Sequence, residues 1–548
     1  MRLPWGITIW VLRTLLLLSL LFPSYCLAQS PPWEWCKGQR GLASDITVDT
    51  FGNSFALVSV YNEDNLLGLS GQYSGSFLVK LDTEGVPQWS KSLINCGVDR
   101  LVHAYGHLYA AGEGWGEFSL GSWAVQADTL SPTYFIAKLD LDGNVMWMFK
   151  ASSQSNTQTG DIAVRASGEV FVTGSGYGEV VVDGDTVLNV PGNALAYFWK
   201  LDPDGSFAWL RTGGCQLSSK TRAKGAAIDQ FGNFYATGYT SADPEYCDAI
   251  SFGQLTIPVE SSLFIAKLSN SGDFDWVRWG IGALGSDVDW FGDSILVITG
   301  SAYASVEIEG QPWFTVSQDL AAFVAGFDST GQVLWTVPSF EGVAYGLRLA
   351  VDSVSIWACA DSDGPFVIDQ EHQVGPANHA LVLNLTPTGQ VNWIAHAASP
   401  PGESCALEST GFALGGDGAG YVSGYMLTTD GVGCSLDFQT CAISTMPDLN
   451  PYWTLFVGRL HSSQVGMTEH WQASLAVYPN PCGDMLNLEF ALSRPMPVKL
   501  LSIDGRVVTD FIVQPGRNLI STSAFSSGTY FLEVGDTGKG TQRVVVQH

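Results

Sequence analysis

A phrase of about thirteen residues recurs along this chain and constrains its fold more than any other feature. Its pattern is an apolar run that ends in Lys-Leu-Asp or a close variant, then a glycine three residues later and a tryptophan four residues after the glycine. Alternating apolar residues on both sides of a polar turn predict a β-hairpin in every copy. One copy follows another after 58 to 67 residues, with the glycines at Gly85, Gly143, Gly205, Gly272, Gly331 and Gly389.

A second phrase precedes each hairpin, as in residues 46–59 (ITVDTFGNSFALVS) and 162–174 (IAVRASGEVFVTG), and it occurs seven times in looser form. Two hairpins in each period give four antiparallel strands, which is the blade of a β-propeller. The two ends of the array complement each other. Residues 33–38 (WEWCKG) match the tryptophan strand of the hairpin phrase, but the first strand of that phrase does not precede them. Residues 456–460 (FVGRL) match the first strand, but no tryptophan strand follows them.

The sequence therefore predicts an all-β chain in which residues 29–468 form a seven-bladed β-propeller of four-stranded antiparallel blades. Its N-terminal strand closes the ring, and closure removes the exposed sheet edges that invite aggregation. An open solenoid is the alternative. The repeat tryptophans are predicted to fill the space between neighbouring blades, because they bring the largest apolar area. These residues are Trp35, Trp89, Trp147, Trp209, Trp276, Trp335 and Trp393.

The first 28 residues have the features of an export signal. Arg2 and Arg13 flank the start of an apolar run, and small residues precede an expected cleavage between Ala28 and Gln29. Acylation of Cys26 as a lipoprotein is the alternative, which the bulky residue before it disfavours. No later stretch has the length and apolarity of a membrane span.

The charge balance excludes several classes of partner. The chain has 25 Lys and Arg against 53 Asp and Glu, which gives a formal net charge of −28. Phosphate backbones and anionic membranes need a cationic surface, so we expect no nucleic-acid partner. The composition is rich in Gly and aromatic residues, as expected for short strands and tight turns.

Nine cysteines remain after removal of the signal, so at least one of them is unpaired. Disulfides persist in proteins that leave the cytosol. We expect Cys215 to pair with Cys247, and Cys405 to pair with either Cys434 or Cys441. No C-x-x-C motif occurs, so a zinc ribbon or a thioredoxin-type site is not expected.

From residue 469 the repeat stops and a different pattern of alternating strands runs to residue 548, typical of a small immunoglobulin-like β-sandwich. This segment resembles the type A C-terminal sorting domain of the type IX secretion system of Bacteroidetes, although it ends in Gln547-His548 where many relatives have a lysine. The motif residues that carry the resemblance are Tyr478, Pro479, Asn480, Pro481, Asp504, Gly505, Gly528 and Tyr530.

This resemblance implies export across the outer membrane, with the secretion machinery as a partner, followed by release or attachment to surface lipopolysaccharide. The preceding repeats also resemble the bacterial β-propeller repeats that are often found beside such domains. We therefore expect an extracellular or outer-surface protein.

Few residues suggest chemistry. His103 and His107 have a spacing that suits a metal, but they align with polar turn residues of the other repeats. Asp-rich turns such as residues 140–143 resemble the start of a calcium loop but lack its later glutamate. We interpret Asp82, Asp140, Asp202 and Asp328 as turn residues. No cofactor and no catalytic or metal-ligating residue is predicted, although a structural calcium ion is compatible with the acidic loops.

No G-x-S-x-G motif occurs, and no pair of carboxylates can be assigned from spacing alone. The favoured function is a non-enzymatic binding or adhesion module with a glycan or a surface protein as ligand. A secreted glycan- or peptide-degrading enzyme with carboxylates at the propeller mouth is the alternative, and a purely structural surface protein is a third. The candidate ligand-stacking residues outside the tryptophan pattern are Trp115, Trp123, Tyr177, Tyr246, Trp290, Tyr303 and Trp313.

Overall fold

The computed structural model describes most of residues 30–546, and within these residues every regular element is a β-strand and no helix occurs. This confirms the all-β prediction for the described part of the chain. Correspondingly, no described helix has the length and apolarity that a membrane crossing requires. The residues inside this range that are not described are 128–131, 154–156, 183–184, 216, 218–219, 293, 317–319, 401–402, 404, 429–432, 446–452, 462–475, 479–484, 491–495, 503–506, 514–515, 524, 526–527 and 535–540.

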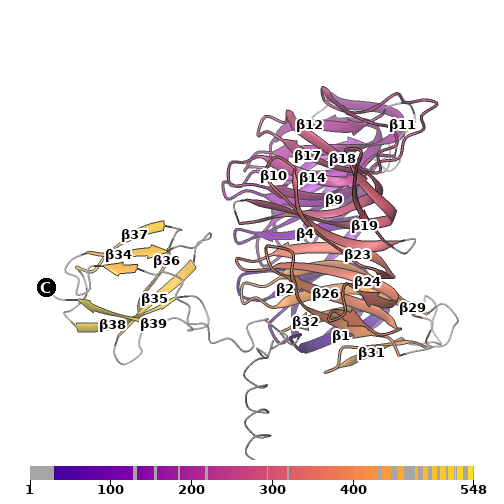
Figure 1. The fold of residues 1–548 in the computed structure, drawn as a ribbon. Coiled ribbons are helices and arrows are strands. Elements are labelled where there is room, and N and C mark those ends of the chain that lie inside the picture. Colours follow the sequence, from indigo (N-terminus) through magenta and orange to yellow (C-terminus); the bar gives the residue numbers. More distant parts are fainter. Residues whose placement is uncertain are drawn as a thin grey trace, which may run out of the picture.

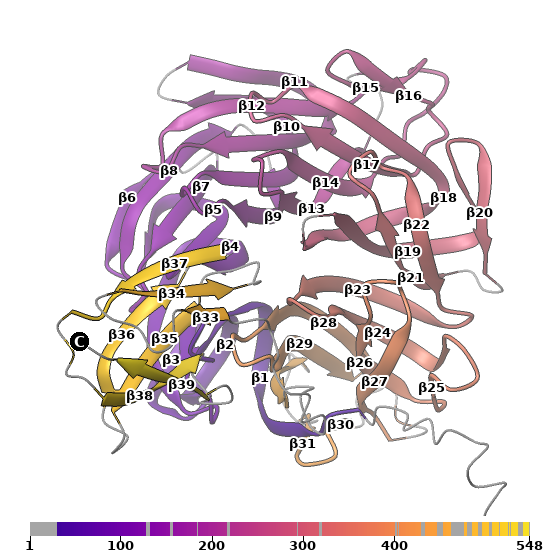
Figure 2. The ribbon, with the colours of Figure 1, turned by 60° about the vertical axis from the view of Figure 1, so that its left-hand side comes forward.

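Residues 33–460 form seven units of four consecutive antiparallel strands, which we call first to fourth strand (Figures 1 and 2). Three long strands belong to two units each, because they end one unit and begin the next. These strands are β1 (Trp33–Val48), β4 (Pro87–Ala104) and β18 (Phe274–Phe291).

The strands of the first four units follow the order of the chain. Unit 1 comprises β1, β2 (Ser54–Leu66), β3 (Leu69–Leu81) and β4. Unit 2 comprises β4, β5 (His107–Leu120), β7 (Thr133–Leu139) and β8 (Val145–Ser153). Unit 3 comprises β9 (Thr157–Val164), β10 (Val170–Val182), β11 (Asp185–Leu201) and β12 (Phe207–Gly214). Unit 4 comprises β13 (Arg222–Ile228), β14 (Phe234–Tyr239), β17 (Leu263–Leu268) and β18.

The remaining units repeat the arrangement. Unit 5 comprises β18, β19 (Ile295–Ile308), β21 (Ala321–Phe327) and β22 (Val333–Pro338). Unit 6 comprises β23 (Glu341–Val351), β24 (Ile356–Val367), β26 (Asn378–Leu385) and β27 (Val391–Ala398). Unit 7 comprises β28 (Cys405–Leu414), β29 (Gly420–Thr428), β32 (Trp453–Leu460) and β1. Short strands inserted between second and third strands are β6 (Trp123–Gln126), β15 (Ile250–Phe252), β16 (Leu255–Ile257), β20 (Gln311–Thr315), β25 (Gln373–Val374), β30 (Ser435–Asp437) and β31 (Ala442–Ser444).

The N-terminal strand β1 joins the two ends of the array. Its first half, residues 33–40, pairs with β32 of unit 7, and its second half, residues 41–48, pairs with β2 of unit 1. Hydrogen bonding through β1, β4 and further pairings between units connects units 1, 2, 3 and 7 into a single network of 17 strands. In Figure 2 first strands such as β9, β13 and β28 lie toward the middle of the arrangement, and outer positions are taken by strands such as β12 and β27.

The repeat tryptophans lie against the turn of the following unit. A Cβ added to Gly85 would come within 2.8 Å of the Trp35 ring, and one added to Gly389 would come within 2.6 Å of the Trp335 ring. The same relation holds for Trp89 with Gly143, Trp147 with Gly205, Trp209 with Gly272 and Trp276 with Gly331. Trp393 instead packs edge-on against Trp357, with ring centroids 5.0 Å apart.

Three disulfides join cysteines in the described part of the chain, and two of them agree with the prediction. Cys215 pairs with Cys247, and Cys405 pairs with Cys434 rather than with Cys441. The third joins Cys36 of β1 to Cys441, a residue 405 positions later that lies next to β31. Cys96 and Cys359 are free and buried.

The C-terminal region contains two small sheets. One holds β33 (Ala476–Tyr478), β34 (Met485–Phe490) and β37 (Gly516–Ser521), and the other holds β35 (Met496–Ser502), β36 (Val507–Val513), β38 (Gly528–Val534) and β39 (Thr541–Val546). Leu488 of the first sheet and Leu500 and Leu532 of the second belong to one buried cluster. The two sheets therefore share a core, as the layers of a sandwich do.

We expect Gly389→Ala to destabilise the protein more than Gly310→Ala. Both glycines have a positive φ, +81° and +75°, so both alanines bear a similar backbone strain of about 1 kcal/mol. Only the new Cβ at position 389 collides with an indole, whereas nothing lies within 4 Å of a Cβ at position 310. Overpacking should add about 1–3 kcal/mol. Urea unfolding of the two variants measures the difference, and equal midpoints would contradict the indole contact.

Candidate functional site

Each first strand contains an irregularity at the same place. The pairing register with the second strand shifts by at least one residue, for example between Ala43 and Asp45 in β1 and between Gly285 and Asp287 in β18. A β-bulge of this kind bends a strand and redirects its side chains. The residues that follow the shift in units 1 to 7 are Asp45, Arg100, Asp161, Gly225, Asp287, Arg348 and Gly411.

Three of these residues are aspartates that accept hydrogen bonds from the backbone of the next unit. Leu101 N donates to Asp45 Oδ2 at 2.8 Å, and Ala226 N donates to Asp161 Oδ2 at 3.1 Å. In the same way Leu349 N donates to Asp287 Oδ2 at 3.0 Å. All three carboxylates are buried. These carboxylates accept hydrogen bonds from N–H groups on the first strand of the following unit. The N–H groups lie on the edge of that strand that is not paired with the second strand of the same unit.

The two arginines add charge pairing to this set. Arg100 lies 3.2 Å from Asp45 and 2.8 Å from Asp161, so it bridges the carboxylates of units 1 and 3. Burial would lower the pKa of Arg100, but these carboxylates outweigh it and raise the pKa above its usual value. Arg348 donates from Nε to the carbonyl oxygen of Thr410 in unit 7 at 3.0 Å.

Glycine occupies the position where no side chain fits. A Cβ on Gly225 would lie 2.6 Å from Val288 N, and a Cβ on Gly411 would lie 2.6 Å from Ile46 N. Both N–H groups are bonded instead by the aspartate that precedes them, Asp287 and Asp45 respectively. Unit 7 therefore meets unit 1 in the same way that unit 4 meets unit 5.

Further carboxylates hold the beginnings of first strands. Glu113 accepts hydrogen bonds from the backbone N–H and the hydroxyl of Thr157, and Asp361 accepts the equivalent pair from Ser409. Burial raises the pKa of Glu113, and it raises the pKa of Asp361 to about 7. Since these oxygens are bonded to the neighbouring strand, they hold units together rather than present an acid or a base to a substrate.

The turn aspartates behave as predicted. Asp140 Oδ1 accepts from the backbone N–H groups of Asp142 and Asn144, and Asp82 and Asp328 make the equivalent bonds in their own turns. Asp202 caps its turn through its carbonyl oxygen, which accepts from Gly205 N. Turn bonding accounts for these residues without a calcium ion.

The histidine pair occupies a hairpin between the first and second strands of unit 2. His107 Nδ1 lies 3.0 Å from the carbonyl oxygen of Tyr105, and burial lowers the pKa of His103. Among the described residues no group of three or more His, Cys, Asp or Glu side chains is arranged to hold a metal ion.

The seven candidate stacking residues fall into two groups. Trp290 packs edge-on against Tyr235 at 4.9 Å, and Trp313 packs against Phe323 while its Nε1 donates to Thr336. These two belong to the interior. The other five have exposed fractions of 42 to 55% and remain candidates: Trp115, Trp123, Tyr177, Tyr246 and Tyr303.

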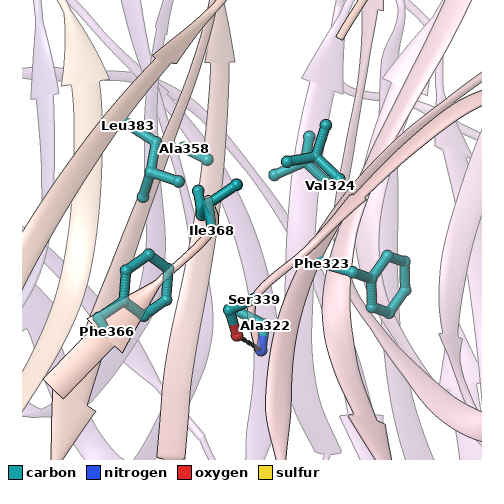
Figure 3. Close-up of a pocket in the computed structure, with 9 residues that line it drawn as sticks. Ala322, Phe323, Val324, Ser339, Ala358, Phe366, Ile368 and Leu383 are labelled. Atoms are coloured by element: carbon teal, nitrogen blue, oxygen red, sulfur yellow. Dashed lines mark hydrogen bonds between the residues drawn. The ribbon is translucent and has the colours of Figure 1, made fainter. Parts of the chain in front are cut away.

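Two cavities of very different size occur among the described residues. An apolar cavity of about 10 Å³ lies between units 5 and 6 beside Val324, Ile368 and Leu383 (Figure 3), and it has space for about one water molecule. A wider cleft of about 610 Å³ lies beside the Cys215–Cys247 disulfide. Its charged side chain, Arg211, donates to the carbonyl oxygens of Leu210, Ser271 and Gly272, so each of its three nitrogens already makes a hydrogen bond to the protein.

The motif residues of the C-terminal segment are only partly described. Tyr478 ends β33, and Gly528 and Tyr530 lie in β38, where Tyr530 is buried in the core shared by the two sheets. The predicted cleavage residues Ala28 and Gln29 lie outside the described residues, as do Pro479, Asn480, Pro481, Asp504 and Gly505.

Sequence reasoning missed the interface aspartates. Asp45, Asp161 and Asp287 each stand directly before the apolar residue that begins the repeated second phrase. Each aspartate also stands four residues before the first residue of the turn in that phrase. Aligning the repeats one residue further toward the N-terminus would have shown this column. Its meaning would still have been missing, because the hydrogen-bond acceptor and its donor belong to different units.

Comparison with known proteins identifies one part of the chain. Residues 476–547 match the family described as the secretion system C-terminal sorting domain. This confirms the resemblance of the C-terminal segment and indicates a protein exported by the type IX secretion system to the cell surface or the medium. No curated protein sequence matches the chain.

Several solved structures show remote likeness. PorZ, a bacterial surface component of the type-IX secretion system of Porphyromonas gingivalis, is 10% identical, with 92% of this chain and 81% of PorZ covered at a TM-score of 0.20. A eukaryotic initiation factor is 11% identical, with 65% and 87% covered and a TM-score of 0.28. The extracellular region of plexin A4 is 8% identical, with 83% and 61% covered and a TM-score of 0.30. At these TM-scores the likeness carries no argument for fold or function.

We expect Asp361→Asn to flatten the pH dependence of stability. The folded pKa of about 7 lies above the ordinary value of 3.8, so protonated Asp361 favours the fold and its contribution is lost as pH rises from about 4 to 7. Asparagine cannot ionise, so this loss, roughly 2–4 kcal/mol over that range, should disappear in the variant.

Urea unfolding at pH 4.5 and pH 7.5 measures this effect. Asp142→Asn removes a carboxylate from an exposed turn and controls for the change in net charge. An Asp361→Asn variant with the same pH dependence as the Asp142→Asn variant would show that Asp361 is ionised in the folded protein.

Proposed function

We propose that the protein is a seven-bladed β-propeller that the type IX secretion system exports and that acts outside the cell as a non-enzymatic binding or adhesion module. The single observation that carries the export is the sorting-domain match over residues 476–547. The binding role is favoured because the buried carboxylates that the fold brings together, such as Asp45, Asp161 and Asp361, are bonded to neighbouring strands. They hold a scaffold and leave its loops for recognition.

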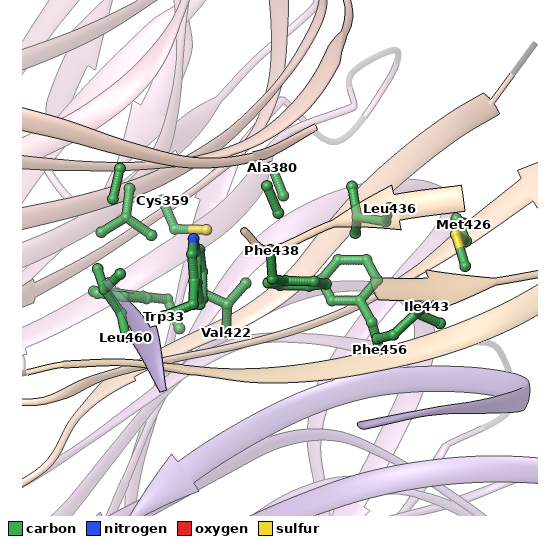
Figure 4. Packing of buried hydrophobic residues seen from close by; sticks show 14 of the residues in the cluster. Trp33, Cys359, Ala380, Val422, Met426, Leu436, Phe438, Ile443, Phe456 and Leu460 are labelled. Atoms are coloured by element: carbon green, nitrogen blue, oxygen red, sulfur yellow. The ribbon is translucent and has the colours of Figure 1, made fainter. Parts of the chain in front are cut away.

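Closure of the ring by the N-terminal strand is supported by the contacts of Trp33. Its indole is 1% exposed and meets Phe438 edge-on at 4.9 Å (Figure 4). Trp33 Nε1 donates to the carbonyl oxygen of His396 at 3.1 Å, and Thr440 Oγ1 donates to the carbonyl oxygen of Trp33 at 2.8 Å. The first strand of the chain is thereby anchored in units 6 and 7.

Two further links support the same closure. Thr410 Oγ1 donates to the carbonyl oxygen of Ala43, and Tyr421 Oη donates to that of Gly52, so unit 7 is bonded to unit 1. The Cys36–Cys441 disulfide adds a covalent bond at the same junction. We propose residues 29–468 as the propeller, residues 469–548 as the sorting domain and residues 1–28 as the signal peptide.

Trp33→Ala should lower the free energy of unfolding by about 3–5 kcal/mol, since a fully buried indole is lost from the junction. Trp123→Ala is the matched control, because that indole is 42% exposed and its removal should change the free energy by less than about 0.5 kcal/mol. Urea unfolding compares the two variants. Similar midpoints would favour an open array whose terminal strand contributes little.

Deletion of residues 469–548 should leave the protein in the periplasm, because the segment that the secretion machinery recognises is absent. Cell fractionation of the truncated and full-length proteins measures this. A reporter fused to residues 469–548 and the native signal is the converse test and should reach the surface or the medium. N-terminal sequencing of the exported protein should begin at Gln29. Surface display of the truncated chain would contradict the proposed export route.

A further inference from the structure

Three second strands contain the same local sequence. Units 2, 3 and 5 contain an aromatic residue between two small residues, at positions 114–116 (GWG), 176–178 (GYG) and 302–304 (AYA). These aromatic residues lie outside the tryptophan repeat, but they share a register of their own. Trp115, Tyr177 and Tyr303 each stand seven residues after a residue that pairs with the last residue of the third strand, namely Leu108, Val170 and Leu296.

All three aromatic side chains are open to solvent to the same extent. The exposed fraction is 44% for Trp115, 44% for Tyr177 and 42% for Tyr303. The small neighbours are required by the packing underneath. A Cβ on Gly114 would lie 2.4 Å from the Phe118 ring, and one on Gly176 would lie 2.9 Å from the methyl group of Thr157.

The three positions lie at one end of the units. A second strand begins at the turn from the first strand, so a residue seven positions on lies roughly 23 Å away at the opposite end. β10 also pairs with β8 through Val180 and Val181, so units 2 and 3 are hydrogen-bonded to each other just beyond Tyr177. β5, β10 and β19, which carry the three residues, can be followed in Figure 2.

The polar groups beside the aromatic residues are acidic or neutral. Two residues after each aromatic residue stand Glu117, Glu179 and Ser305. A carboxylate or hydroxyl next to an exposed ring can bond a sugar hydroxyl while the ring packs on the apolar face of the sugar. The same carboxylates and the net charge of −28 repel uronate and sulfate groups.

We propose that Trp115, Tyr177 and Tyr303 are stacking platforms for an uncharged polysaccharide. This inference rests on the proposed binding function and names its ligand class and its residues. Equivalent platforms on separate units suit a polymer that presents the same sugar ring repeatedly. Because each platform contributes separately, the affinity should come from several weak contacts acting together.

The test is affinity electrophoresis of the full-length protein in native gels that contain dextran, mannan or soluble β-glucan, with heparin and polygalacturonate as acidic comparisons. The wild type should be retarded by at least one of the uncharged polysaccharides and by neither acidic one. Replacing Trp115, Tyr177 and Tyr303 together by alanine should abolish the retardation, and each single replacement should weaken binding about 2- to 10-fold.

Two variants make the result specific. Phe51→Ala with Phe231→Ala removes two aromatic rings that are 67% and 72% exposed in turns at the other end of the units, and it should bind as the wild type does. Replacing the three platform residues by phenylalanine keeps the rings and should retain most of the affinity.

Several results would overturn the inference. These are retention of binding by the triple alanine variant, equal loss in the Phe51 and Phe231 control, retardation by the acidic polysaccharides, and no retardation by any uncharged polysaccharide. The proposed adhesion function is measured separately, by attachment of the exported protein to intact cells. Attachment to cells without polysaccharide binding would support the adhesion function with a different ligand. Absence of both attachment and polysaccharide binding would contradict that function.

Discussion

The free edge of each first strand sets the constraint on which the repeat region depends. A first strand is paired on one side only, so its other edge presents backbone N–H groups that must find acceptors when buried. Aspartates placed after a β-bulge in the preceding unit supply these acceptors, as Asp161 does for Ala226 N. The bulge and the carboxylate act together, because the bend redirects the side chain toward the next unit. Neighbouring units are thus joined by these bonds as well as by the strands that two units share, β1, β4 and β18.

The same constraint explains the junction between the last unit and the first. Gly411 meets Ile46 N as Gly225 meets Val288 N, so the contact between units 7 and 1 repeats a contact found inside the array. The chain then adds further bonds at this junction. The N-terminal strand pairs with β32, and Trp33 enters a core that units 6 and 7 share. A disulfide between Cys36 and Cys441 fixes the strand. These bonds join the first strand of the repeat region to its last unit.

In this scaffold the residues that stabilise the fold are different from the residues that we propose to bind a ligand. The buried charges are engaged with backbone groups or with each other, as Arg100 is with Asp45 and Asp161. Exposed side chains on the second strands and in the inserted hairpins make none of these bonds, so they can change while the junctions stay intact. The exposed aromatic residues of units 2, 3 and 5 lie in such places. Export by the type IX system would deliver this surface to the outside of the cell.

The sequence by itself determined the features that rest on short-range contacts. The turns are one example, because an aspartate such as Asp140 bonds N–H groups within four residues. The Cys215–Cys247 disulfide spans 32 positions, and the sorting segment is recognised from its own strands and turns. Tertiary structure alone decided which groups meet across units. The Asp45 bond to Leu101 N and the pairing of Cys36 with Cys441 depend on how units pack against one another, and no single repeat specifies that packing.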